Sequence, residues 1–188
     1  MTKTEFDILR ARQETPGCER VLHFNNAGAA LMPRQVVDAV TEHLRLEAEM
    51  GGYEAAESAH EAVEHVYDAA SQLINCQPDE IAIIDNATRA WDMAFYSLSF
   101  RSGDRILTSM AEYASNYIAF LQIAQRTGAV VEAIPNDENG QVSVDALQHL
   151  IDERVKLIAI THVPSNGRLV NPAMEIGRIA RQADILYL

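Results

Sequence analysis

The chain has 188 residues, of which 48% are hydrophobic and 22% charged, and its formal net charge is -12. This size and balance are typical of one globular domain, or slightly more than one, with a packed core. No apolar run approaches the roughly 20 residues of a membrane-spanning helix, and the acidic balance without a basic patch argues against a nucleic-acid binder.

The N-terminal residues lack the apolar stretch of a secretory signal. The two cysteines, Cys18 and Cys76, have neither a metal-binding spacing nor the number that a disulfide framework needs. Each is interpreted as a free thiol, and a cytoplasmic protein that holds no metal is expected.

The first part of the chain is predicted to be irregular up to about Pro33 and helical after it. A helix over about 34–49 is indicated by apolar residues at near-helical spacing, namely Val36, Val37, Val40, Leu44 and Leu46. Gly51-Gly52 is expected to break this helix, and a second helix is predicted over about 54–75.

The rest of the chain alternates between short apolar runs and helical segments. Strands are predicted over 80–85, 105–108, 129–134, 156–162 and from 185 onward. Helices are predicted over 88–100, 115–127, 144–154 (with Ser143 as N-cap) and 172–182. This alternation predicts an α/β fold, a mostly parallel sheet with helices on both faces. Because parallel strands are buried on both sides, an end inside the apolar run 185–188 leads us to expect an incomplete sequence.

Ligands of open α/β sheets bind at the carboxyl ends of the strands, where three strand-to-helix turns stand out. In the first, residues 85–89, small residues, the Thr88 hydroxyl and a helix N-terminus favour an anion such as phosphate. The alternative is that Thr88 only caps its helix. Neither G-x-G-x-x-G nor G-x-x-x-x-G-K-[ST] occurs in the chain, which disfavours a dinucleotide or P-loop site.

The second turn, residues 111–116, carries Tyr113, which can stack on a planar ligand or lie on the surface without a ligand. The third, residues 161–168, offers Ser165 and Asn166 as donors to a ligand oxygen, although Pro-Ser-Asn-Gly is also strong turn chemistry. Together the three turns predict a site for a phosphate, a flat ring and a hydrogen-bonded ring substituent.

The order and spacing of these turns, from about Leu22 to Leu188, resemble the class V aminotransferases. That family includes cysteine desulfurases, isopenicillin N epimerase-like enzymes and carbon–sulfur lyases. The resemblance implies the fold-type I large domain, pyridoxal 5'-phosphate (PLP) as cofactor, a small amino-acid substrate and a homodimer without nucleic-acid or membrane partners. It leaves open transamination, epimerisation, desulfuration and carbon–sulfur lysis.

The resemblance also implies roles for individual residues. Ala87 and Thr88 stand where the family has a Gly-Thr-Thr-like phosphate loop, with alanine in place of the first threonine. Tyr113 replaces the histidine that stacks on the pyridine ring, which argues against a typical desulfurase because tyrosine, with a pKa near 10, is a poorer proton shuttle. Asn166, or Ser165 if the register slips by one, is expected to contact the ring oxygen.

The N-terminal segment resembles the family's active-site rim. Asn26, Ala27 and Gly28 match the stretch that lines the substrate side of the pocket, and Gly51-Gly52-Tyr53 resembles a mobile loop. Residues 1–53 are therefore expected to contribute to the rim and 54–188 to form the N-terminal part of the PLP-binding domain. By the same resemblance, the family's C-terminal remainder and small domain are expected to be missing from this sequence.

Only two lysines occur, Lys3 and Lys156. Lys156 is predicted at the amino end of its strand, about 20 Å from the site at ~3.3 Å per residue, so it is not expected to be the family's Schiff-base lysine. This chain is expected to supply a cofactor cradle and to be inactive alone. The alternatives are a scaffold or interaction protein of the same fold, or one half of a split enzyme.

Overall fold

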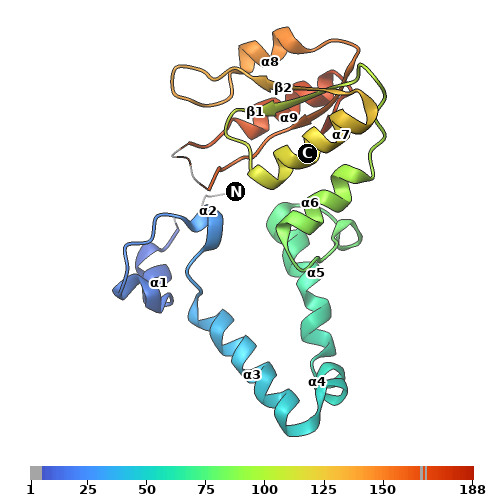
Figure 1. The fold of residues 1–188 in the computed structure, drawn as a ribbon. Helices are drawn as coiled ribbons and strands as arrows, with labels where there is room; N and C mark the ends of the chain where they lie inside the picture. The colour runs from blue at the N-terminus through green and yellow to red at the C-terminus, as the bar shows by residue number, and fades with distance from the viewer. Residues whose placement is uncertain (1–5, 166, 168) are drawn as a thin grey trace. The chain divides into compact units, whose positions relative to one another are not determined.

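A computed structural model describes residues 6–165, 167 and 169–188. They form two compact units, one up to Ile83 and one from Ile84 onward. Figure 1 labels their α-helices and the strands β1 and β2. No helix in the described ranges is long and apolar enough to cross a membrane.

The N-terminal unit is helical. Its elements are α1 (Ile8–Gln13), η1 (Pro16–Glu19), α2 (Asn26–Ala29), α3 (Arg34–Met50), α4 (Gly52–Ser58), α5 (His60–Ile74) and η2 (Pro78–Glu80). The prediction of an irregular start was therefore wrong in part, because three short helical segments precede Pro33. Each has six residues or fewer, too short to show a helical period in the sequence.

The helix predicted over 34–49 is confirmed as α3. It ends at Gly51, whose φ of +94° suits glycine. The single helix predicted over 54–75 was wrong, because Ala59, with ψ near 3°, separates α4 from α5. Gly52 and Tyr53 begin α4 instead of forming a loop. The break at Ala59 involves neither glycine nor proline, so the sequence carried no signal for it.

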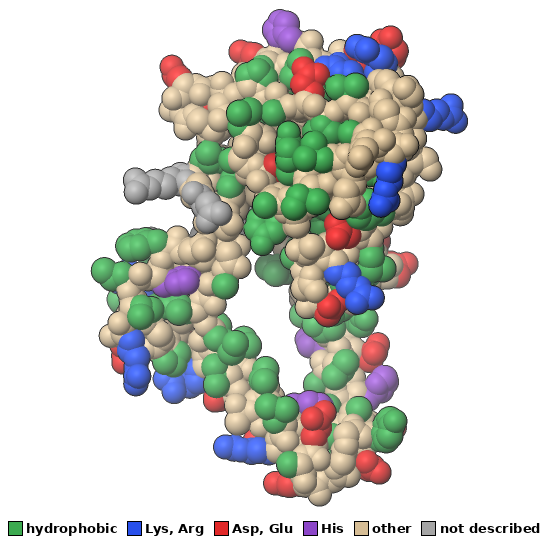
Figure 2. Space-filling view, viewed as in Figure 1, with side chains coloured by type: hydrophobic (Ala, Val, Ile, Leu, Met, Phe, Trp, Pro, Cys, Tyr) green, Lys and Arg blue, Asp and Glu red, His purple; other side chains and the backbone are tan. Residues whose placement is uncertain are grey.

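One face of α3 is apolar and exposed. Val36, Val37, Val40 and Leu44 are each more than two-fifths accessible, and apolar side chains show along this segment in Figure 2. The described residues of the N-terminal unit therefore leave this face uncovered.

The C-terminal unit is an α/β layer structure. Its elements are α6 (Ala87–Tyr96), β1 (Arg105–Ser109), α7 (Ala114–Thr127), β2 (Val130–Ile134), α8 (Val144–Leu150), β3 (Val155–Ala159), α9 (Ala173–Gln182) and β4 (Leu186–Tyr187). The strands lie in the order β2-β1-β3-β4, and every pair is parallel. The predicted parallel α/β sheet is thus confirmed.

Successive side chains of β1 belong to two separate buried cores. Ile106 belongs to a cluster with Phe95 of α6 and Phe120 of α7. Leu107 belongs to the other cluster, with Leu147 of α8 and Ile176 of α9. Because successive side chains of a strand point to opposite faces, α6 and α7 cover one face of the sheet and α8 and α9 the other.

Four predicted elements differ from the structure. Helix α6 ends at Tyr96, before the predicted end at residue 100. Residues 81–84 are not a strand, since no described strand pairs with them, and Ile83 is 56% exposed. Helix α8 keeps its predicted cap, with Ser143 Oγ accepting from the Ala146 N–H, but ends at Leu150 because Ile151 is extended. Strand β3 ends at Ala159, so residues 161–162 lie beyond it.

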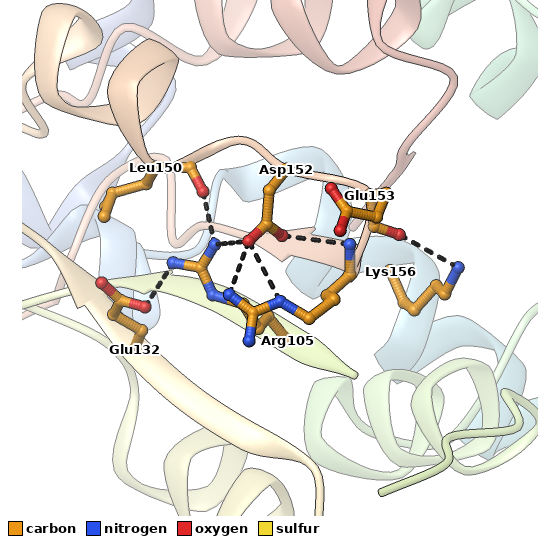
Figure 3. Close-up of polar contacts among 7 residues, drawn as sticks. Arg105, Glu132, Leu150, Asp152, Glu153 and Lys156 are labelled. Atoms are coloured by element: carbon orange, nitrogen blue, oxygen red, sulfur yellow. Dashed lines mark hydrogen bonds and ion pairs between the residues drawn. The ribbon is translucent and has the colours of Figure 1, made fainter. Parts of the chain in front are cut away.

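A charged cluster fixes the amino-terminal end of β1 (Figure 3). The Arg105 side chain is largely buried and donates to the Glu132 carboxylate and the Leu150 carbonyl. Its Nη1 lies 3.1 Å from Asp152 Oδ2, which also pairs with Arg154 at 2.7 Å. A buried guanidinium is tolerated only when such partners satisfy it, so this cluster ties β1 and β2 to the segment before β3.

The hydrogen bonds from Arg154, with a smaller contribution from Arg105, lower the pKa of Asp152 from 3.8 to about 2. A carboxyl group whose pKa is lower in the folded than in the unfolded chain stabilises the fold at pH values above its unfolded-state pKa. This stabilisation is lost as the pH falls through the folded-state pKa. We therefore expect Asp152→Asn to lose less free energy of unfolding than the wild type between about pH 4 and about pH 2. Urea titrations at several pH values measure the free energy of unfolding. Arg154→Ala should likewise reduce the loss of this free energy over the same pH interval. If the free energy of unfolding of Asp152→Asn fell with pH as steeply as that of the wild type, the lowered pKa of Asp152 would not be the cause.

Candidate functional site

The turns after β1 and β3 emerge at one edge of the sheet. The two strands are parallel neighbours, with Thr108 opposite Ala159 near their carboxyl ends. A pocket of about 440 Å³ lies there. Its lining comes from both turns: Ala111, Glu112, Tyr113, Ala114, Thr161, Pro164, Ser165 and Gly167. The structure thus unites two of the three predicted turns in one pocket.

Two predicted ring-contacting residues, Tyr113 and Ser165, line this pocket. Tyr113 is the residue before α7 and is 51% exposed. Ser165 is half-buried. Asn166, the other predicted contact to the ring oxygen, lies outside the described residues. The pocket therefore offers an aromatic ring and a hydroxyl from two elements far apart in sequence.

The remaining predicted turn, residues 85–89, forms the start of α6, but contrary to the prediction it follows no described strand. The Asn86 side chain caps this helix by accepting from the Arg89 N–H at 2.9 Å, so the cap is Asn86, not Thr88. Ala87 and Thr88 are the first two helical residues, whose N–H groups have no partner within a helix. The carboxylate of Asp85, the first residue of this turn, lies 3.8 Å from Arg89 Nε in an exposed ion pair.

A hydroxyl pair joins this turn to α7. Thr88 Oγ1 lies 3.5 Å from Ser115 Oγ in the first turn of α7. The first turns of α6 and α7 therefore meet, and Ser115 is a site residue that the sequence patterns did not single out. The only signal for it was its position two residues after Tyr113.

The carboxylate of Glu112 is the hydrogen-bond centre of the pocket edge. Oε1 accepts from the Tyr113 N–H and from Asn116 Nδ2, both at 2.9 Å, and from the Thr161 hydroxyl. Oε2 accepts from the Thr161 N–H at 3.2 Å and from the hydroxyls of Thr108 at 3.2 Å and Ser109 at 3.4 Å. The sequence showed Glu112 only as the neighbour of Tyr113.

Asn171 holds the other end of the loop that follows β3. It is 2% exposed. Its Oδ1 accepts from the Val142 N–H at 3.0 Å, and its Nδ2 donates to the Thr161 carbonyl at 2.7 Å. Its own N–H donates to the carbonyl of His162, whose side chain is exposed. The loop that carries Ser165 is thus tied at both ends.

The predicted substrate-side residues Asn26, Ala27 and Gly28 form the short helix α2. The Asn25 side chain caps it by accepting from the Gly28 N–H at 3.2 Å. A Cβ on residue 28 would lie 2.6 Å from Asn25 Nδ2, so the capping side chain would have to shift to admit it. These residues belong to the N-terminal unit, and their place beside the substrate stays a prediction.

Solved structures share this fold. An apo cysteine desulfurase from Thermococcus onnurineus NA1 matches with a TM-score of 0.81 at 22% identity, over 98% of this chain and 47% of the other. A second match is a mutant of the cystine C–S lyase C-DES with glycine covalently linked to its PLP cofactor. Its TM-score is 0.78 at 24% identity, over 94% of this chain and 47% of the other.

Curated relatives and a family model match as well. A probable cysteine desulfurase of Synechocystis sp. is 30% identical over 96% of this chain and 44% of the relative. A probable cysteine desulfurase of Xylella fastidiosa is 34% identical over 97% of this chain and 47% of the relative. The chain spans about half the length of the relatives it matches. The aminotransferase class-V model matches residues 22–188, so the chain belongs to the aminotransferase class-V family.

Proposed function

We propose that this chain provides the cofactor cradle of a PLP-dependent enzyme that transforms an amino acid. The observation that carries the proposal is the shared pocket of Tyr113 and Ser165 at the carboxyl edge of the sheet. Membership of the family and the fold shared with a C-DES structure that carries PLP support it.

The start of α6 fits a phosphate. The N–H groups of Ala87 and Thr88 and the positive end of the helix dipole favour an anion there. The family's first threonine is an alanine in this chain, so one hydroxyl is missing from the loop itself. Ser115 Oγ, 3.5 Å from Thr88 Oγ1, supplies a second hydroxyl from α7 in its place.

The pocket fits a planar ring. Tyr113 offers an aromatic face for offset stacking, and Ser165 offers a hydroxyl for the ring oxygen. The part of Asn166 in this contact remains the prediction made from the sequence. Asn26, Ala27 and Gly28 are proposed for the substrate side.

When bound, PLP supplies an electron sink that stabilises negative charge at the substrate's Cα. The chain's own residues bind the phosphate, stack on the ring and hold its oxygen, and the buried Pro164 keeps water from one wall of the pocket. Lys156 lies in β3 near its amino end, with Nζ 3.5 Å from the Glu153 carbonyl. It therefore moves no proton at the pocket.

The names of the relatives favour a sulfur-containing amino acid as the substrate, and tyrosine at position 113 argues against the histidine-assisted proton transfer of typical desulfurases. Transamination and epimerisation stay open as reaction types. A homodimer is proposed from the family resemblance. The competing proposal is a scaffold protein of this fold that binds no cofactor.

Stacking by Tyr113 predicts a ranked loss of PLP affinity. Tyr113→Phe keeps the aromatic face and should bind PLP like the wild type, whereas Tyr113→Ala should bind about tenfold more weakly, since a stacking pair contributes up to ~1.5 kcal/mol. Equilibrium dialysis with PLP measures both. The control is Tyr117→Ala, one turn further along α7 and outside the pocket lining. Absence of saturable PLP binding by the wild-type chain would favour the scaffold.

The hydroxyl pair predicts a phosphate-specific defect. Thr88→Ala and Ser115→Ala should each weaken PLP binding about fivefold, because each removes one hydrogen bond of ~1 kcal/mol to the phosphate. Neither should change the binding of pyridoxal, which lacks the phosphate, and Thr88→Ser should restore PLP binding. Parallel dialysis with the two ligands separates these effects. Equal losses for PLP and pyridoxal would reject the phosphate assignment.

A further inference from the structure

A single carboxylate, that of Glu112, joins both turns that line the pocket. We propose that Glu112 is a positioning residue, which sets the Tyr113 ring and the loop carrying Ser165 at the spacing that the cofactor ring requires. This inference rests on the proposed function and deepens it, because it assigns a role to a group that need not touch the ring itself.

The hydrogen bonds of Glu112 come from three separate elements. The hydroxyls of Thr108 and Ser109 lie at the end of β1, and both residues are buried. Asn116 and the Tyr113 N–H belong to the start of α7. Thr161, which donates through both its N–H and its hydroxyl, follows β3 and is 49 residues away in sequence. Hydrogen bonds to an ionised acceptor are the stronger kind.

Two of the donors to Glu112 are backbone N–H groups, those of Tyr113 and Thr161, and through them Glu112 acts on the ligand site. The Tyr113 N–H fixes the backbone from which the tyrosine ring extends, and the Thr161 N–H fixes the start of the loop that leads to Ser165. Asn171 holds the far end of that loop. Glu112 therefore sets the position of one pocket wall relative to the other.

The sheet itself has other supports. Residues of β1 and β3 share both buried cores, and the Arg105 cluster secures the opposite end of β1. Removing Glu112 should therefore loosen the pocket edge without unfolding the C-terminal unit.

The chemistry of Glu112 predicts a ranked series of variants. An ionised carboxylate only accepts hydrogen bonds, whereas a glutamine amide has one accepting oxygen and one donating NH₂. If the glutamine NH₂ takes the place of Oε2, it can donate to the hydroxyls of Thr108 and Ser109, which rotate to accept. Only the Thr161 N–H then loses its acceptor. Glu112→Gln should thus be mild, while Glu112→Ala leaves every donor of the set without this acceptor.

The matched control is Glu132→Gln. Glu132 is likewise a partly buried carboxylate of the C-terminal unit, but it pairs with Arg105 at the amino-terminal end of β1. This variant should lower stability and leave the pocket unchanged.

The test measures PLP affinity by dialysis and the circular dichroism induced in bound PLP, which reports the orientation of the ring. We expect Glu112→Ala to weaken PLP binding at least about tenfold and to reduce the induced signal per bound PLP, because binding must then order two pocket walls that Glu112 no longer holds in place. Glu112→Gln should fall between it and the wild type, and Glu132→Gln should match the wild type in both readouts. Hydrogen exchange without ligand should rise in residues 111–114 and 161–165 of Glu112→Ala but not in β2.

Wild-type affinity and signal in Glu112→Ala would overturn the inference, as would an equal loss in Glu132→Gln. If Glu112→Ala does not fold, Glu112→Gln serves as the test. Wild-type circular dichroism of PLP bound to Glu112→Gln would then overturn the inference. A wild-type chain that fails to bind PLP saturably overturns the proposed function, and this inference with it. Binding by the wild type together with unchanged Glu112 variants overturns this inference alone.

Discussion

The parallel pairing of β1 with β3 is the constraint on which the candidate site depends. Its register places Thr108 opposite Ala159, so the turns that follow the two strands emerge together at one edge. The described residues 110–113 and 161–169 contribute no buried side chain to either core cluster. Their relative position is therefore set by the strands behind them and by Glu112, which accepts hydrogen bonds from both.

The two ends of β1 carry two different electrostatic arrangements. At the amino end, the buried Arg105 is satisfied by Glu132, Asp152 and a backbone carbonyl. At the carboxyl end, Glu112 is surrounded by neutral hydroxyl, amide and backbone donors. A charge removed from water needs such full partnering. The first arrangement joins β1 to its neighbours in the fold, and the second fixes the geometry of a pocket.

In the proposed cradle, the departures from the family pattern that the sequence resemblance implies fall at positions where the fold offers a substitute. Ala87 lacks the hydroxyl of the threonine expected there, and the meeting of α6 with α7 brings Ser115 beside Thr88. Tyr113 stands where a histidine is expected, and it lines the pocket with an aromatic residue. The proposed cradle thus retains phosphate and ring contacts while it loses a side chain suited to proton transfer near neutral pH.

Local periodicity and turn chemistry were enough to predict the alternation of strands and helices, the parallel sheet and the turns that follow β1 and β3. They failed for residues 81–84, where an apolar run has no described strand to pair with, so that the turn at 85–89 follows no described strand. They also failed at Ala59, where no breaker residue marks the end of α4. The places of Glu112, Ser115 and Asn171 at the site could be found only in the folded chain. Their hydrogen bonds join residues up to 49 positions apart, and such pairing depends on how the strands align, which no local pattern records.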